Sequence, residues 1–314
     1  MKKTTHAAIA LVALALGGTA SATMVGPAAG YNVFIFGAGN FTSQNTDTMG
    51  DLAAGGNVSL MNYSVAQGIA GNAAQNPNPA RLVVGGKLTA QNGGVGSNQN
   101  GAIYYGSSTP ALTSFTARGG EFGNQTLVSF SSAASLYAAY SGQLGTLSPN
   151  GSTSFNGSGN TLSFTGSAAG LNVFTVTGAT LSSSNTIDIS APTGSTVLIN
   201  VTGASATFQN GSVMETGITG ASVLYNFITA TSVDLAGSKD PMGSILAPDA
   251  GVVGGYGSMY GQLIAGSYSG NTQFNNGSFS GTLPAPVPLP PSLELLACAI
   301  LGLLAWCRGT RAGL

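Results

Sequence analysis

Charged side chains are scarce in this sequence. They make up 5% of the 314 residues, with eight Lys and Arg against nine Asp and Glu and a formal net charge of −1. A protein that binds nucleic acid presents a cluster of basic side chains to the phosphates, and this chain has none. We therefore expect no nucleic-acid partner.

Histidine, cysteine and tryptophan are missing from the long central part of the chain. The one histidine is His6, whereas Cys298, Cys307 and the one tryptophan, Trp306, lie near the C-terminus. The central part therefore has no Ser-His-Asp or Cys-His arrangement, no disulfide and no zinc site of the usual kind. This predicts a domain without catalytic activity or cofactor, stabilised by apolar burial and backbone pairing.

Other catalytic arrangements have little support. Lys87 or Lys239 would act as a base only if it were desolvated beside a serine. Polysaccharide-cleaving β-helices need paired carboxylates or a basic face, whereas the acids here are scattered along the chain. A secreted polysaccharide-active enzyme is therefore a second alternative.

Apolar residues are plentiful by contrast, at 43% of the chain, and there are 48 glycines. This composition is not that of a disordered protein, because it can bury a sizeable core. The polar surface must come mainly from Asn, Ser, Thr and Gln.

The N-terminus has the three parts of a secretory signal peptide. Lys2 and Lys3 are followed by an apolar run over 7–16 and by the small residues Ala20, Ser21 and Ala22. This order predicts a signal peptide over 1–22, with recognition of Ala20 and Ala22 and cleavage after Ala22. The exported domain would then span residues 23–283.

The C-terminus has a second export-related pattern. A Pro-rich spacer over 284–291 precedes an apolar run over 292–306, and Arg308 and Arg311 follow. Roughly 15 apolar residues are marginal against the ~20 that span a bilayer. The arginines would stay on the cytoplasmic side. We expect residues 292–314 to anchor the chain transiently in the inner membrane.

This tail resembles the PEP-CTERM class of sorting signals, in its VPLPA-like variant. The residues that carry the resemblance are Val287, Pro288, Leu289, Pro290 and Pro291, with the apolar run and the terminal arginines. The resemblance implies that an exosortase-type enzyme cuts near the Pro motif. It also implies export to the surface or exopolysaccharide matrix of a Gram-negative bacterium. The sequence departs from the class in Glu294 and in its short basic end.

Short Gly-bounded β segments fill the region between the two ends. Residues 52–58 resemble residues 82–88, and GSILA at 243–247 resembles GQLIA at 261–265, an offset of 18 residues. Repeats at a fixed spacing are typical of solenoids. The sequence therefore predicts a mainly β domain folded as a right-handed parallel β-helix, in which Ile245 and Leu263 stack in neighbouring turns. A β-sandwich of short strands is the alternative.

One segment, 131–144, has helical periodicity. Ala133, Leu136, Tyr137, Tyr140 and Leu144 recur every three to four residues, and a serine precedes them. We expect one helix here, packed by its apolar side along the sheet or coil.

Taken together, the segments resemble the choice-of-anchor A family of bacterial surface proteins, with its ice-binding-like adhesive domain. The resemblance implies a β-helix-like fold, an adhesive role and no catalytic residues. The matching stretches are YNVFIFGAGNFTSQNTDTMG at 31–50, LAAGGNVSLMNYSV at 52–65, GLNVFTVTGATL at 170–181, GSTVLINVTG at 194–203, VLYNFITATSVDLAG at 223–237, GSILAPDAGV at 243–252 and GQLIAGSYSGNTQFNNGSFSGTLP at 261–284.

Few side chains are candidates for ligand contact. Asp47 and Asp51 are close in sequence and are candidates for a cation such as calcium, although no D-x-D-x-D-G run exists. Tyr256, Tyr260 and Tyr268 stand in Gly-rich segments and are candidates for glycan contact, although tyrosines also fill buried rungs.

The sequence thus favours a non-catalytic adhesive protein that binds extracellular polysaccharide or a neighbouring cell surface. Ice binding is the alternative, and it requires a flat face with regular small side chains. The threonines Thr175, Thr177, Thr186, Thr196 and Thr202 predict no such ladder.

The export pattern gives the first testable prediction. Secreted material should lack residues 1–22 and should end near Pro288–Pro291, because both processing signals would have been used. Intact-mass measurement of the secreted protein checks both ends. Recovery of a C-terminus at Leu314 would contradict the sorting prediction.

Overall fold

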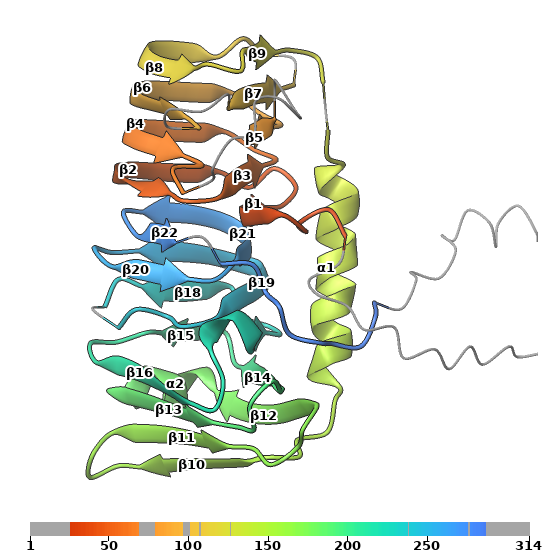
Figure 1. Ribbon diagram of the computed structural model, residues 1–314, viewed down its shortest axis with the longest axis vertical. Coiled ribbons are helices and arrows are strands. Elements are labelled where there is room, and N and C mark those ends of the chain that lie inside the picture. Colours follow the sequence, from red (N-terminus) through yellow and green to blue (C-terminus); the bar gives the residue numbers. More distant parts are fainter. Residues whose placement is uncertain are drawn as a thin grey trace, which may run out of the picture.

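A computed structural model describes residues 26–68, 79–96, 101–106, 108–125, 127–237, 239–275 and 277–286 of the chain. The predicted signal peptide, with Ala20 and Ala22, and the predicted sorting motif and anchor at 287–314 lie outside the described residues. The described chain forms a column of stacked short strands with one long helix, α1 (Phe130–Gly145), beside it (Figure 1).

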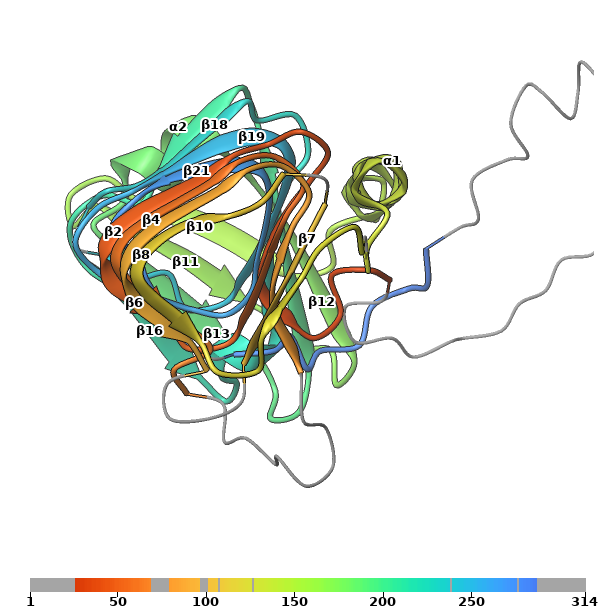
Figure 2. The same ribbon diagram turned by 90° about the horizontal axis from the view of Figure 1, so that it is seen from above.

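Each coil of the column has three sides, as the view along the column shows (Figure 2). The helix side contains β1 and faces α1. The open side contains the first residues of β2. The third side contains the last residues of β2 together with β22. The strands of the first half are β1 (Tyr31–Ile35), β2 (Phe41–Thr48), β3 (Asp51–Ala54), β4 (Val58–Val65), β5 (Ala80–Val84), β6 (Leu88–Val95), β7 (Ala102–Tyr105), β8 (Ala111–Ala117) and β9 (Glu121–Phe122).

The second half follows α1 and begins at the opposite end of the column (Figure 1). Its strands are β10 (Ser152–Asn156), β11 (Thr161–Thr165), β12 (Leu171–Thr177), β13 (Thr186–Ser190), β14 (Thr196–Thr202), β15 (Ser205–Thr207), β16 (Ser212–Thr216), β17 (Val223–Phe227), β18 (Ser232–Leu235), β19 (Ser244–Gly254), β20 (Ser258–Tyr260), β21 (Leu263–Gly270) and β22 (Gln273–Asn275). A short helix, α2 (Gly178–Ser183), and a 3-10 turn, η1 (Gly220–Ser222), interrupt them.

The chain therefore does not wind from one end of the column to the other. It starts in the middle, climbs to β9, returns along α1 and climbs again from β10. The two halves join where β21 pairs in parallel with β1 and β2, as in Val33 with Leu263 and Phe41 with Tyr268.

The parallel register confirms the predicted repeats. Ile245 pairs with Leu263, and Leu52 pairs with Leu82. The pairings between named strands are parallel except for that of β10 with β11. The β-sandwich alternative is therefore wrong, because a sandwich is built from antiparallel sheets.

Stacking places like side chains in line inside the coils. One inward file on the helix side is formed by Phe174, Ile199, Tyr225, Ile245, Leu263, Val33, Leu52, Leu82 and Ile103, all fully buried. Burial of each such side chain contributes about 1.5–3 kcal/mol. The core therefore runs unbroken through the junction of the two halves.

Helix α1 confirms the predicted helix with one extra residue at each end. Ala133, Tyr137, Tyr140 and Leu144 are buried in a cluster with outward residues of the helix side such as Phe34. Helix α2 was not predicted, because its six residues carry no apolar periodicity. The Thr177 hydroxyl accepts a hydrogen bond from the Thr180 amide at its start, as an N-cap does.

A buried amide network fixes the C-terminal end of α1 against the column. Asn226 Nδ2 donates to the Ser141 carbonyl (3.0 Å) and to Asn200 Oδ1 (2.8 Å). The Ser141 hydroxyl donates to Asn226 Oδ1 (2.6 Å), and Asn200 Nδ2 donates to the Leu144 carbonyl (2.9 Å). The two asparagines therefore connect the carbonyls of the last turns of α1 to β14 and β17 of the column.

The first residues of the predicted spacer are hydrogen-bonded to the same helix. Tyr140 Oη donates to the Pro284 carbonyl and Gln143 Nε2 to the Ala285 carbonyl, each at 2.9 Å. Within the described ranges, no helix is both long and apolar enough to cross a membrane. The predicted anchor at 292–306 lies outside those ranges.

The amide network predicts a stability effect. Asn226→Ala should lower the free energy of unfolding by about 2–3 kcal/mol, because it leaves buried polar groups of Asn200 and Ser141 without their partner. Asn156→Ala, on the exposed strand β10, is the matched control and should cost less than about 1 kcal/mol. Urea unfolding of both variants measures the difference. Equal losses would show that the network does not hold the helix.

Candidate ligand-binding face

The open side of the column carries a regular file of hydroxyl side chains. Backbone pairing places Ser269, Thr42, Ser59 and Thr89 next to one another on β21, β2, β4 and β6. Neighbouring strands lie about 4.7–4.9 Å apart, so the hydroxyls repeat at that spacing. We call these residues the hydroxyl file.

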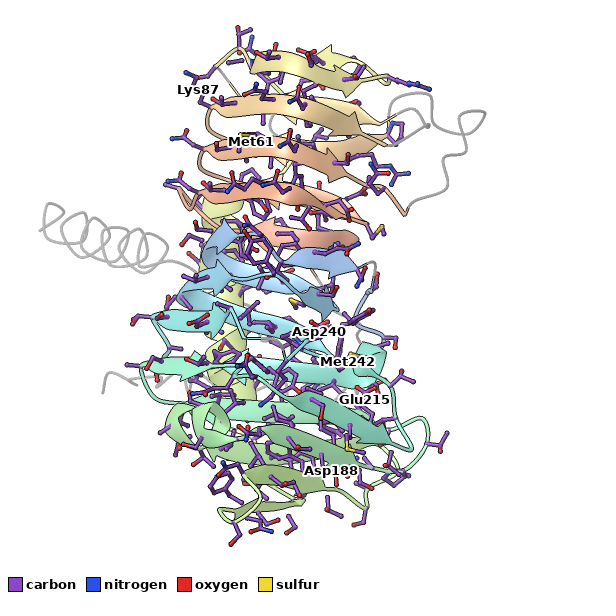
Figure 3. All side chains as sticks on the ribbon, turned by 90° about the vertical axis from the view of Figure 1, so that its left-hand side faces the viewer. Met61, Lys87, Asp188, Glu215, Asp240 and Met242 are labelled. Carbon is purple, nitrogen blue, oxygen red and sulfur yellow. The ribbon has the colours of Figure 1, made fainter. Side chains whose placement is uncertain are left out.

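A second file runs parallel to the first. It consists of Gln44, Met61, Gln91 and Thr113, on β2, β4, β6 and β8, and its members are exposed. Figure 3 shows Met61 on the surface of the upper coils and Lys87 near their edge, whereas Asp188, Glu215 and Asp240 lie on the lower coils. Neither file contains a charged side chain.

An asparagine ladder forms the corner beside the second file. Asn62 Nδ2 donates to Asn45 Oδ1 (2.7 Å), and Asn92 Nδ2 donates to Asn62 Oδ1 (3.1 Å). The three residues have φ values of 56°, 49° and 54°, a left-handed conformation that asparagine adopts more readily than most residues. The ladder therefore turns the coils of β2, β4 and β6 at the same point.

The five threonines considered above do not lie in one common ladder. Thr177 pairs with Thr202, whereas Thr175 pairs with Asn200, Thr196 with Leu171, and Thr186 with Thr161 and Ser212. The hydroxyl file escaped prediction because its residues come from four separate segments. The similarity of segments 52–58 and 82–88 was the only sequence signal for the hydroxyl file, because aligning these segments places Ser59 beside Thr89.

The tyrosine candidates have different outcomes. Tyr268 as a glycan contact is wrong, because its ring lies inside the coil, 2% exposed and stacked on Phe41 with centroids 5.0 Å apart. Its hydroxyl accepts a hydrogen bond from the Thr272 amide, and burial raises the pKa of this hydroxyl. Tyr256 and Tyr260 are 83% and 44% exposed. They lie at β20, which pairs with β22 on the third side, away from the hydroxyl file.

The two candidate cation ligands are held by different partners. Asp51 forms an ion pair with Arg81 at 3.1 Å, and Asp47 accepts a hydrogen bond from Gln273 Nε2 at 3.2 Å. Burial raises the pKa of both carboxyls, that of Asp51 to about 6, although Arg81 opposes this shift. Among the described residues, no group of three or more His, Cys, Asp and Glu is arranged to hold a metal ion. Calcium binding stays a prediction.

Lys239 meets the condition of a desolvated lysine beside a serine. Both Lys239 and Ser184 are fully buried, and Lys239 Nζ donates to the Ser184 carbonyl and lies 3.3 Å from Ser184 Oγ. The Ser184 hydroxyl donates to the Leu181 carbonyl at 2.7 Å, at the end of α2. A substrate has no access to this hydroxyl, so the pair holds the coils together and offers no exposed nucleophile.

Comparison with known proteins gives one family. Residues 24–276 match the family described as "Putative Ice-binding-like adhesive domain". No curated protein matches the chain. No solved structure matches it either.

The buried lysine predicts a pH-dependent stability. Burial lowers the pKa of Lys239 from 10.5 to about 8. Between these values the unfolded chain binds a proton that the folded chain lacks, so the free energy of unfolding rises with pH. The rise should be on the order of 2 kcal/mol and should be lost again as the pH falls through about 8.

Urea unfolding between about pH 7.5 and pH 9 measures most of this effect, below the pKa of about 10 at which unfolded tyrosines ionise. Lys239→Met should remove the rise, whereas Lys87→Met, at an exposed position, should keep it. A rise of the same size in both variants would assign the effect to another group.

Proposed function

The chain belongs to the ice-binding-like adhesive domain family, and on that premise we propose that it is an exported, non-catalytic surface or matrix protein. Its proposed ligand is a neutral extracellular polysaccharide, bound along the open side of the column. The observation that carries this proposal is the pair of files, because they present neutral polar groups at a regular spacing across consecutive coils.

The chemistry of the files suits a polymer of sugars. Hydroxyl and carboxamide groups both donate and accept hydrogen bonds, as sugar hydroxyls do. Each such bond contributes only about 0.5–1.5 kcal/mol net, so a single site binds weakly. Many molecules on one cell or fibre would raise the avidity roughly 100-fold or more. Weak repeated contact of this kind is what an adhesive surface protein requires.

Export and sorting remain part of the same proposal. The signal-peptide pattern at 1–22 and the VPLPP tail support secretion by a Gram-negative bacterium, transient anchoring at 292–306 and release by an exosortase-type enzyme. The exit of the chain favours this arrangement. Pro284 and Ala285 are bonded to α1, which lies on a different side of the coils from β2 and β4 (Figure 2). An anchor that continues from this point leaves the open side accessible.

Ice binding is the second candidate function. The observation in its favour is the hydroxyl file, whose four small side chains repeat at the strand spacing. The neighbouring file is less regular, since it combines two glutamines, a methionine and a threonine. Thermal hysteresis or shaped ice crystals in a solution of the protein would favour this function over polysaccharide adhesion.

The adhesive function predicts binding that is weak for one molecule and insensitive to salt. Full-length protein in solution should bind neutral polysaccharides in the millimolar range or undetectably. The same protein coated densely on beads should bind a dextran surface strongly. This binding should weaken little between low salt and about 0.5 M salt, because few charges are present to be screened.

A matched pair of variants locates the binding face. Thr42→Asp should weaken bead binding at least about tenfold by placing a charge on the open side, whereas Ser163→Asp, on β11 in the other half, should not. Bead binding that collapses as salt rises would show that the few charged side chains form the site.

A further inference from the structure

The open side is hollowed where the two halves of the column meet. A hollow of about 310 Å³ lies between β21, β2 and β4. Its walls include hydroxyls of the hydroxyl file, two residues of the second file and Asn271, which follows β21. The residues used below are Thr42, Ser59, Ser269, Gln44, Met61 and Asn271.

The hollow arises from the different lengths of the strands that meet there. Ser43 pairs with Gly270, the last residue of β21, whereas β2 continues through Gln44, which pairs with Met61 above it. Gly270 adds no side chain to the gap, and a Cβ atom there would lie 2.3 Å from the Gly254 carbonyl oxygen. The step between the two halves is therefore a built-in feature of the junction.

The lining has the chemistry of a sugar-binding site. Thr42, Ser59 and Ser269 supply hydroxyls, and the carboxamides of Gln44 and Asn271 supply further donors and acceptors. Met61, 40% exposed, supplies a flexible apolar surface for the C–H face of a ring. No lining residue is charged, so nothing in the hollow compensates the charge of a phosphate or a uronic acid.

We propose that this hollow is a subsite for one neutral pyranose residue of the polysaccharide. The inference rests on the proposed function and deepens it, because it names where one sugar of the polymer is held. The size favours a single ring, since 310 Å³ is at the small end of the range of ligand pockets. The flanking files would then contact the neighbouring sugars along the column.

Saturation-transfer NMR on the full-length protein tests the subsite directly. The probes are the methyl glycosides of glucose, galactose, mannose and N-acetylglucosamine, with methyl glucuronide as the charged comparison. At least one neutral glycoside should receive saturation and methyl glucuronide should not. Ser59→Phe fills the hollow and should reduce affinity for that glycoside about tenfold or more, and Gln44→Ala should weaken it without filling the space.

Two control variants separate the hollow from other surfaces. Thr165→Phe adds the same ring at an exposed position of β11, in the other half of the column. Thr175→Phe adds it to a second hollow, of about 340 Å³, beside Phe155 near the far end of the column. Both should bind the glycoside as the unmodified protein does. Thermal unfolding of each variant verifies that it is folded.

The outcomes distinguish this proposal from the proposed function. If coated protein binds polysaccharide but Ser59→Phe and Gln44→Ala leave glycoside binding unchanged, the subsite is overturned and the adhesive function stands. Loss of glycoside binding only in Thr175→Phe overturns the subsite in the same way. If the glycoside binds in the hollow but coated protein binds no polysaccharide, the subsite stands and the adhesive function is overturned. If nothing binds, both are overturned.

Discussion

The parallel pairing of β21 with β1 and β2 is the contact on which the rest of the structure depends. It joins residues more than 200 positions apart, such as Val33 and Leu263, and turns two half-columns into one. At this junction Phe41 stacks on Tyr268, and Phe274 packs edge-on against Tyr268. Without this pairing each half would expose the apolar interior of a coil. The junction also brings Ser269 next to Thr42, so the open side is continuous only because the halves meet in register.

A chain with few charges must use neutral polar groups for several purposes. Asparagine turns the coils at the corner ladder of Asn45, Asn62 and Asn92, where its tolerance of positive φ is needed. Asparagine also satisfies the buried end of α1 through Asn200 and Asn226. Serine and threonine cover the open side. The environment of each residue, and not its type, decides whether it shapes the fold or is available to a ligand.

Local patterns were sufficient to predict part of the fold. The apolar periodicity of 131–144 predicted α1, and the repeat of GSILA and GQLIA predicted the pairing of Ile245 with Leu263. Both signals are local, because helix periodicity and coil length each show within a short stretch of sequence. The start of the chain in the middle of the column could not be predicted in this way. It depends on β1 and β21, whose contact has no local signal.

The candidate site was harder to predict for the same reason. A side chain reaches the open side only if its strand has the correct inward and outward alternation, and one residue of slippage reverses it. Tyr268 is only a candidate for surface contact in the sequence, because the alternation of β21 has no local signal, whereas Ser269 beside it is the residue that faces out. Prediction of the hydroxyl file requires the register of four strands at once. Asp47 and Asp51 are near in sequence, but they lie on two different strands, β2 and β3, and each carboxylate has its own partner.

The position of the last coil has a mechanical consequence. In a solenoid that winds from end to end, a pull on the C-terminus peels the terminal coil, which is held along one edge only. Here β21 lies between β19 and β1, and the chain continues through β22 before it crosses α1 near the middle of the column. Tension on the C-terminal segment therefore meets a coil that is paired along both edges and must break both ladders before it can unravel. The topology therefore places the exit of the C-terminal segment beside a coil that is paired along both edges.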